Sequence, residues 1–418
     1  RQRRGQKPVE PIYTRADAEA ALDRGTAEPM ETWFEPGPGV RARFWNAGHI
    51  LGSVSIELLV EAGGPRPVHI LFSGDLGPDE KVFHPEPEAP LGFDYVICES
   101  TYGNRDRDDM SVAARRAALA SEIDAALARG GNLVIPCFAV ERSQELLHDI
   151  GVLIAEGRIS DRPVFLDSPL ASRITRVFIK HASDLDDVAL DEAALFRDPN
   201  FRIIEDVEDS KAINRIRGGA IIISPSGMAD AGRIKHHLRN NLWREDATVL
   251  FVGYQAPGTL GARILDGASK VRIHGREIEV RATVRSIGNY SAHADQRELL
   301  DWILERQPVN GGVFLNHGED SARRALRDLL VSKGLEAERI HLPELDQSFG
   351  LAPTGANWLV PEPRARMEAL EHDWYDDYVE FTLNLGERLG RAGSPAYKAS
   401  LMSRLSAALE EGAGDARQ

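Results

Sequence analysis

The chain has 418 residues, 42% of them hydrophobic and 28% charged. This composition is typical of folded domains, and the length is too great for one ordinary core. No run approaches the ~20 apolar residues of a membrane-spanning helix, so we expect no membrane partner. The formal net charge of −15 excludes a uniformly basic nucleic-acid coat protein, and a polyanionic substrate would need a locally basic surface.

The pattern of apolar residues predicts two kinds of layer. Residues 32–76 contain short strands separated by turns, whereas between residues 108 and 255 apolar strands alternate with helices, as in a parallel α/β layer. The elements expected in the second layer are helix 111–129, strand 132–139, helix 141–156, strands 163–168 and 218–228, a helix through 236–238 and strand 247–255. The elements expected after it are strands in 270–284, helix 296–305, a strand in 311–320, helix 321–333 and a tail helix, 397–411.

Both cysteines, Cys98 and Cys137, lie in apolar runs typical of buried strands, so we expect core thiols and no disulfide framework. The sequence begins RQRRGQ, without an initiator Met or a hydrophobic signal core. We therefore expect residence in the cytoplasm.

Three of the twelve histidines share one setting. His49 (NAGHILGS), His293 (NYSAHAD) and His317 (VFLNHGED) each end an apolar strand and enter a turn that bears Gly or Ser. Asp75 (ILFSGDLG) and Glu99 (YVICESTYG) have the same placement. A single acid there more often forms a turn, but three imidazoles and two carboxylates together favour a metal hydrolase.

Nine ordered motifs then carry a family resemblance. They are GHILGS, FSGDLG, ESTYG, FAVERSQELL, DSPLA, SPSGMADAGRIKHHL, GYQAPGTLG, YSAHADQ and NHGE. Their order resembles the metallo-β-lactamase-fold nucleases with a β-CASP insertion, the group that includes RNase J. The resemblance implies an α/β fold: an αββα sandwich interrupted by an inserted α/β cap. We expect the sandwich domain at 1–104 and 285–348, the β-CASP domain at 105–284 and a C-terminal tail at 349–418.

The resemblance also implies roles for the five residues. His49, Asp75 and His317 would be metal ligands, with Asp75 bridging two zinc ions. Two such ions lower the pKa of a bridging water and hold the phosphodiester oxygens. His293, oriented by Glu99, would donate a proton to the departing 3′-oxygen, since a hydrogen-bonded carboxylate favours the imidazolium form.

One family motif has no counterpart in the sequence. The resemblance implies a His-x-His-x-Asp-His string upstream of GHILGS that supplies four ligands, and no such string occurs. Three ligands cannot hold two zinc ions, so we expect that an N-terminal part of about small-domain size is missing from this sequence. The alternative is an inactive paralogue.

A further set of residues at strand-to-helix turns predicts an RNA-backbone groove with weak base preference, since turns and helix N-termini present N–H groups to phosphates. Its members are Ser168, Ser224, Ser226, Gly227, Thr259, Ser291 and Arg142. Each alone is more often a cap or a turn residue. For Arg142 a salt bridge with Glu141 or Glu145 is an equal alternative.

The sequence thus predicts a zinc-dependent ribonuclease that acts between the sandwich and the cap. Two alternatives stay open: a DNA nuclease of the same fold, and a catalytically inactive RNA-binding subunit. Trp374, Tyr375 and Tyr378 in the tail offer a homodimer contact, although packing on their own domain is the favoured interpretation.

Overall fold

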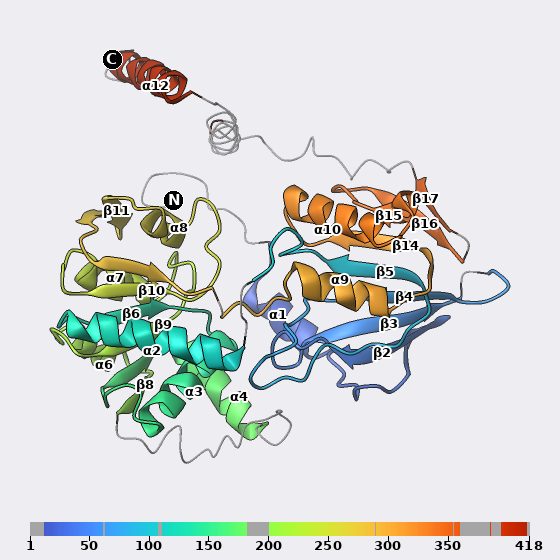
Figure 1. The fold of residues 1–418 in the computed structure, drawn as a ribbon, viewed down its shortest axis with the longest axis horizontal. Coiled ribbons are helices and arrows are strands. Elements are labelled where there is room, and N and C mark those ends of the chain that lie inside the picture. The colour runs from blue at the N-terminus through green and yellow to red at the C-terminus, as the bar shows by residue number, and fades with distance from the viewer. Residues whose placement is uncertain are drawn as a thin grey trace. The chain divides into compact units, whose positions relative to one another are not determined.

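The computed structural model describes residues 12–61, 63–107, 111–181, 200–288, 290–353, 355–359, 385 and 394–415. The chain divides into a larger unit, which runs to residue 345 and includes 349–358, and a smaller unit of 346–348 and 359–418. Within the described residues, the larger unit contains two large sheets, of seven and six strands, and two small two-stranded sheets (Figure 1). We call the seven-stranded sheet with the elements packed on it the first domain, and the six-stranded sheet with its elements the second domain. The mixed α/β fold predicted from the sequence is confirmed.

The first domain is built on a seven-stranded mixed sheet. Its strands, in spatial order, are β1 (Phe34–Gly37), β2 (Val40–Asn46), β3 (Val54–Val60), β4 (Val68–Phe72), β5 (Phe93–Glu99), β14 (Val309–Asn316) and β15 (Ile340–His341). The first four strands pair antiparallel, and β4, β5, β14 and β15 pair parallel. The carboxyl ends of β2, β4, β5 and β14 therefore meet at one edge of the sheet.

Helices α9 (Gln296–Glu305) and α10 (Asp320–Ser332) cover one face of this sheet. Leu299 and Ile303 of α9 pack with Leu326 of α10 on buried residues of β4, β5 and β14. The hairpin of β16 (Ser348–Ala352) and β17 (Gly355–Leu359) packs on the other face, where the Tyr95 hydroxyl donates to the carbonyl of Ala352 at 2.6 Å.

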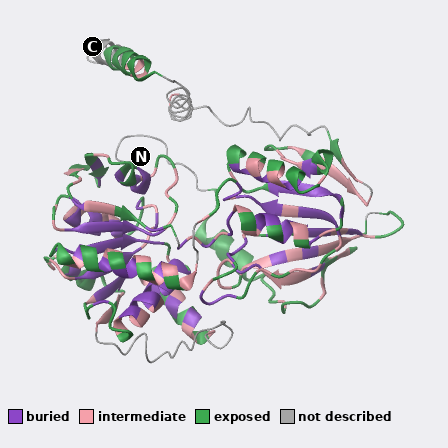
Figure 2. Ribbon diagram, in the orientation of Figure 1, coloured by how far each residue is buried: buried purple, intermediate pink, exposed green. Residues whose placement is uncertain are grey.

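The second domain is built on a six-stranded parallel sheet. Its spatial order is β13 (Thr283–Ser286), β10 (Thr248–Phe251), β6 (Leu133–Pro136), β9 (Ile221–Ser224), β7 (Val164–Asp167) and β8 (Phe201–Ile204). β6, β7, β9 and β10 are buried at every residue, as the purple strands of Figure 2 show. Apolar strands without alternation are typical of a sheet covered on both faces.

Helices cover both faces of that sheet (Figure 1). One face carries α2 (Val112–Ala128), α3 (Arg142–Ala155) and α4 (Pro169–Lys180), and the other carries α6 (Val207–Ile213), α7 (Ile234–Asn241), α8 (Leu260–Leu265) and the β11 (Lys270–Ile273) and β12 (Arg276–Glu279) hairpin. Within the described ranges, no helix is long and apolar enough to cross a membrane.

The helix ends agree with the sequence signals. The Ser111 side chain caps α2, and Gly130, at φ 87°, follows its last turn, as glycine does where a helix ends in the left-handed conformation. The predicted boundary between residues 284 and 285 falls inside β13, which pairs with β10 of the second domain. The smaller unit contains helix α12 (Pro395–Asp415). Trp374, Tyr375 and Tyr378 lie outside the described residues.

Candidate metal centre

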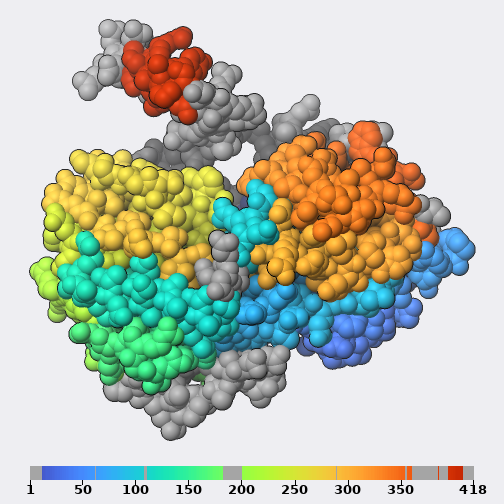
Figure 3. Space-filling model, in the orientation of Figure 1, coloured from blue at the N-terminus to red at the C-terminus, as the bar shows by residue number. Residues whose placement is uncertain are grey.

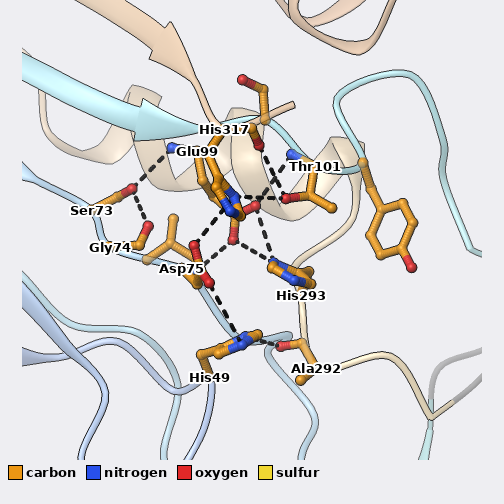
Figure 4. A network of polar contacts seen from close by, with 12 residues as sticks. His49, Ser73, Gly74, Asp75, Glu99, Thr101, Ala292, His293 and His317 are labelled. Carbon is orange, nitrogen blue, oxygen red and sulfur yellow. Dashed lines mark hydrogen bonds and ion pairs between the residues drawn. The ribbon is translucent and has the colours of Figure 1, made fainter. Parts of the chain in front are cut away.

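Five predicted residues meet at the carboxyl edge of the seven-stranded sheet (Figure 4). His49 follows β2, Asp75 follows β4, Glu99 ends β5 and His317 follows β14, while His293 lies between β13 and α9. Because β2, β4, β5 and β14 run in the same direction, side chains at their carboxyl ends converge although they are far apart in sequence. Loops held at such an edge by a rigid sheet are common functional sites.

The His49 ring is oriented by a backbone carbonyl. Its Nδ1 lies 2.9 Å from the carbonyl of Ala292, to which it donates, so Nε2 is free and lies 3.9 Å from a carboxylate oxygen of Asp75. Burial lowers the pKa of His49 to about 4, with the charges of His293 and Lys81 adding to the effect. The ring is therefore neutral at pH 7, which is the form that ligates metals.

Glu99 and His293 form a buried pair. Glu99 is 1% exposed, and its oxygens lie 3.0 and 3.2 Å from Nδ1 of His293. The carboxylate also accepts hydrogen bonds from the backbone N–H groups of Leu76 and Thr101. Burial opposes ionisation of Glu99, but these bonds outweigh it and the pKa of the carboxyl lies below its usual value.

His317 completes the centre from the other side of Asp75. Its Nδ1 lies 3.3 Å from a carboxylate oxygen of Asp75 and 3.2 Å from the hydroxyl of Thr101. His317 has φ 47°, a left-handed conformation uncommon outside glycine. The Thr101 hydroxyl also donates to the carbonyl of His317 at 3.2 Å, which ties this turn to the end of β5.

The donor set fits a zinc ion. His49, Asp75 and His293 offer ligand atoms that all lie within 4.8 Å of one another, and His317 adjoins Asp75. Imidazole nitrogen and carboxylate oxygen are ordinary zinc ligands, and a zinc-binding histidine usually donates its other ring N–H to a carbonyl or a carboxylate. His49 and His293 both meet that second condition, through Ala292 and Glu99.

The predicted groove residues on the second domain have partners inside the protein. Ser168 caps α4 by accepting from the N–H of Ala171, and buried Ser224 donates to the carbonyl of Asp167. Ser226 closes a turn with Ala231. A Cβ at Gly227 would lie 2.9 Å from the ring of Phe138, so any side chain there would require that ring to shift.

The other three predicted groove residues are also engaged. Thr259 caps α8 by accepting from the N–H of Ala262. Ser291 donates to the hydroxyl of Tyr102 at 3.1 Å. Arg142 is buried and paired with Glu145, which is one of the two alternatives that the sequence left open.

A buried hydrogen-bond network surrounds Asp167 at the end of β7 and leads to a prediction about stability. Asp167 accepts from Ser210 at 2.6 Å, Arg233 at 2.7 Å and His237 at 2.6 Å. Asp167→Asn should lower the free energy of unfolding by about 3–5 kcal/mol, because it leaves Arg233 without its buried anionic partner. Urea midpoints at pH 7 measure the loss, and an unchanged midpoint would contradict it.

The same carboxylate should make the stability of the protein depend on pH in the acid range. Burial opposes its ionisation, but the hydrogen bonds from His237, Ser210 and Arg233 lower the pKa of Asp167. A carboxyl with a lowered folded pKa stabilises the protein above its unfolded pKa of about 3.9, and this stabilisation is lost as pH falls through the folded value. Between pH 7 and pH 3 the wild-type midpoint should therefore fall more than that of Asp167→Asn.

Sequence reasoning missed the contacts that surround the centre. Arg107 donates to the carbonyls of Ser291 and His293. Lys81 donates to the carbonyl of His49 and lies 3.4 Å from Glu141, which also accepts from His84. His84 and Glu141 are 57 residues apart, so no local motif signals the pair.

Two domain families match the chain. Residues 143–264 match the Beta-Casp domain. Residues 277–343 match the Zn-dependent metallo-hydrolase RNA specificity domain. The first match lies on the second domain, and the second includes His293, His317 and α9.

Similar proteins carry related names. Ribonuclease TTHA0252 of Thermus thermophilus is 37% identical over 334 residues, which are 78% of this chain and 74% of that protein. An RNase J-like protein of Methanocaldococcus jannaschii is 31% identical over 282 residues, 67% and 64% of the two chains. Transcription termination factor FttA of Cenarchaeum symbiosum is 27% identical over 356 residues, 82% of this chain but only 54% of the factor.

Proposed function

Because this chain belongs to the β-CASP family of metallo-β-lactamase-fold nucleases, we propose that it hydrolyses RNA phosphodiester bonds at the centre described above. The observation that carries the proposal is the convergence of His49, Asp75 and His317 beside the Glu99–His293 pair. A nuclease needs both a charged clamp for the phosphate and a proton donor for the leaving oxygen, and this edge of the sheet offers candidates for both.

His49, Asp75 and His317 would hold the metal, and zinc is the ion that the family uses. When bound, zinc supplies a water of lowered pKa and positive charge for the phosphate oxygens. The low pKa of His49 keeps its Nε2 available as a ligand. We propose two ions, as the sequence resemblance implies. Since tetrahedral zinc takes four ligands, a second ion requires donors beyond these three.

His293 would act as the general acid. Glu99 binds its Nδ1, so the second ring nitrogen is the one left to donate a proton to the departing 3′-oxygen. The carboxylate of Glu99 accepts a hydrogen bond from Nδ1 and fixes the orientation of the ring. Because Glu99 is buried and the pKa of its carboxyl is lowered, it serves as a fixed negative charge and does not itself need to reach the substrate.

Two hollows offer a path for the RNA. One, of about 400 Å³, is lined by His317 with Thr101, Tyr102, Arg105 and Tyr254 among others. The second, of about 610 Å³, shares Tyr102, Arg105 and Tyr254 with it and continues to residues 286–288. In Figure 3 the segment that follows β5, in cyan, lies at the surface between the yellow and orange parts of the chain. The hollows therefore continue from the metal centre along this segment.

Tyr254 and Arg105 give this path the chemistry of a single-strand site. Tyr254 is 47% exposed, so its ring is open to a base, and the exposed Arg105 guanidinium lies 5.8 Å from the Tyr102 ring centroid. Aromatic side chains stack on any base, and Arg binds phosphates. This arrangement favours single-stranded RNA with weak base preference.

Tyr254→Ala should raise KM for single-stranded RNA about 10-fold, because one stacked base is worth ~1–3 kcal/mol. The value of kcat should change little, since the ring does not touch the scissile bond. Tyr254→Phe is the matched control and should behave as wild type because it keeps the ring. Equal effects of both substitutions on KM, or none, would show that no base stacks there.

Matched RNA and DNA oligonucleotides test the function itself. The protein should cleave a labelled single-stranded RNA in the presence of zinc and leave DNA of the same sequence intact. Cleavage of DNA alone would favour the DNA nuclease. RNA binding without cleavage of either strand, with zinc bound, would favour an RNA-binding subunit.

A further inference from the structure

Glu141, the residue before α3, directs its carboxylate away from its own helix. It stands at the N-cap position but makes no capping hydrogen bond. Instead it accepts from the N–H of Leu51 at 3.3 Å and from Nε2 of His84 at 2.7 Å, and it lies 3.4 Å from Nζ of Lys81. All three partners belong to the first domain, so one carboxylate ties α3 of the second domain to it.

Lys81 carries this contact to the metal centre. Its side chain is 2% exposed, and besides pairing with Glu141 it donates to the carbonyl of His49. The N–H of His49 donates to the Ser53 hydroxyl at 3.0 Å, and the His49 ring donates to the carbonyl of Ala292. Hydrogen bonds therefore hold the ring, the backbone N–H and the backbone carbonyl of His49. The bond to the carbonyl depends on Lys81.

A second set of contacts begins at Asp149, two helical turns further along α3, and leads to the segment that carries His293. Asp149 accepts from the hydroxyl of Tyr290 at 2.8 Å, and the guanidinium groups of Arg115 and Arg142 lie 4.9 and 5.8 Å from the centroid of the Tyr290 ring. Tyr290 is fully buried and precedes His293 by three residues. The helix that reaches His49 through Lys81 thus also anchors the segment that carries His293.

Stability alone does not account for Glu141. Taking a lysine and a glutamate out of water costs free energy that their attraction often fails to return. Glu141 also has φ 64°, a conformation that non-glycine residues rarely adopt and that tends to occur at functional sites. Buried charge and backbone strain coincide at Glu141, which links the second domain to His49 through Lys81.

We propose that α3 positions the two histidines of the centre: Glu141 acts on His49 through Lys81, and Asp149 acts on His293 through Tyr290. Neither carboxylate touches the metal or the RNA, so both are positioning residues. Seating of the second domain on the first then aligns the ligand and the proton donor together. The inference rests on the proposed function in that these histidines are taken as the nuclease site.

The test compares Glu141→Gln, Lys81→Met and the double variant with Glu156→Gln. Glu156 lies at the far end of α3 with its side chain 50% exposed, which makes it a matched control. Cobalt(II), titrated by absorbance, reports the affinity of the centre. We expect about 10- to 100-fold weaker cobalt binding in each test variant, the range for outer-shell partners of metal ligands, a lower kcat and an unchanged KM for RNA.

The double variant should be little worse than either single variant, because both remove the same contact and their effects should not add. In the metal-free protein, backbone amides of Ala47, His49 and Ile50 should exchange faster with solvent in the test variants than in Glu156→Gln. None of these amides bonds to Glu141, since Ala47 donates to the carbonyl of Ser53 and the other two to its hydroxyl.

Lowered stability with wild-type cobalt affinity and wild-type kcat would overturn the role of Glu141, since the cluster would then only support the fold. Tyr290→Phe keeps the buried ring and removes the bond to Asp149, and it should lower kcat without changing cobalt affinity. Wild-type kcat in Tyr290→Phe would overturn the role of the second set of contacts. If the wild-type protein neither binds cobalt nor cleaves RNA, the proposed function fails, while the amide exchange still decides whether Glu141 and Lys81 position the His49 loop.

Discussion

Replacing His293 with alanine should lower the rate of RNA cleavage by about 10²–10⁴-fold, the usual contribution of a general acid, and leave the zinc content unchanged. The reason is that Glu99 binds Nδ1 of His293 and holds the ring for proton transfer to the leaving oxygen. Initial rates with a labelled RNA, together with zinc analysis of the same sample, measure both quantities.

The zinc content separates two roles for this ring. His293 belongs to the group whose ligand atoms lie within 4.8 Å of one another, with His49 and Asp75, so the geometry alone admits ligation. Loss of zinc in His293→Ala would make His293 a ligand and contradict the general-acid assignment. His236→Ala is a matched control, since His236 lies on α7 of the second domain and should change neither quantity.

Replacing Asp75 with alanine should abolish zinc binding and RNA cleavage together. Asp75 lies between His49 and His317, 3.9 and 3.3 Å from their ring nitrogens, so its loss removes the only carboxylate that adjoins both of these rings among the described contacts. The loss of affinity should exceed the ~10–100-fold typical of outer-shell partners. Zinc per molecule and initial rates measure the effect.

Asp79→Ala provides the control for that substitution. Asp79 is an exposed acid four residues further along the same loop, and its removal should leave zinc content and cleavage unchanged. If Asp75→Ala kept its zinc and its full activity, the ligand assignment of all three residues would be wrong.

The strands and most helices were predictable because local chemistry decides them. Apolar runs such as residues 133–136 and 221–223 lie in strands that are buried on both faces. Helix α9 was predicted at the same residues that it occupies, and Asp295 and Glu298 form a capping box at its start. Cys98 and Cys137 are buried and free, as predicted, and burial raises the pKa of both thiols.

Other elements had weaker local signals. Helix α4 was not among the predicted elements, although Ser168 as N-cap and Pro169 in the first turn are typical helix-start residues. The β16–β17 hairpin was also not predicted. Its apolar residues Phe349 and Leu351 are partly buried by packing on the first domain, a tertiary contact that leaves no local pattern in the sequence.

The candidate site divides in the same way. His49, Asp75, Glu99, His293 and His317 were recognisable because each stands where a strand ends, and strand direction brings those ends together. Contacts that depend on tertiary packing were not recognisable. His237 and Asp167 are 70 residues apart, and Tyr290 and Asp149 are 141 residues apart, so neither pair leaves a pattern in the sequence.

The groove predicted from small residues stays a prediction, because its members also have structural roles within the protein. Ser168 and Thr259 cap helices, Ser224 donates to the carbonyl of Asp167 on the neighbouring strand, and Ser226 closes a turn with Ala231. These uses explain the residue types without a phosphate. The path along Tyr254 and Arg105 required the shape of the surface, because it combines residues from both domains.

The most direct test of the proposed function is the rate of RNA hydrolysis by metal-stripped protein as zinc is added back. The proposed function predicts no cleavage without metal, recovery of cleavage as zinc binds, and no recovery in Asp75→Ala. Cleavage of RNA by the metal-free protein, or a zinc-loaded wild-type protein that leaves RNA intact, would contradict it.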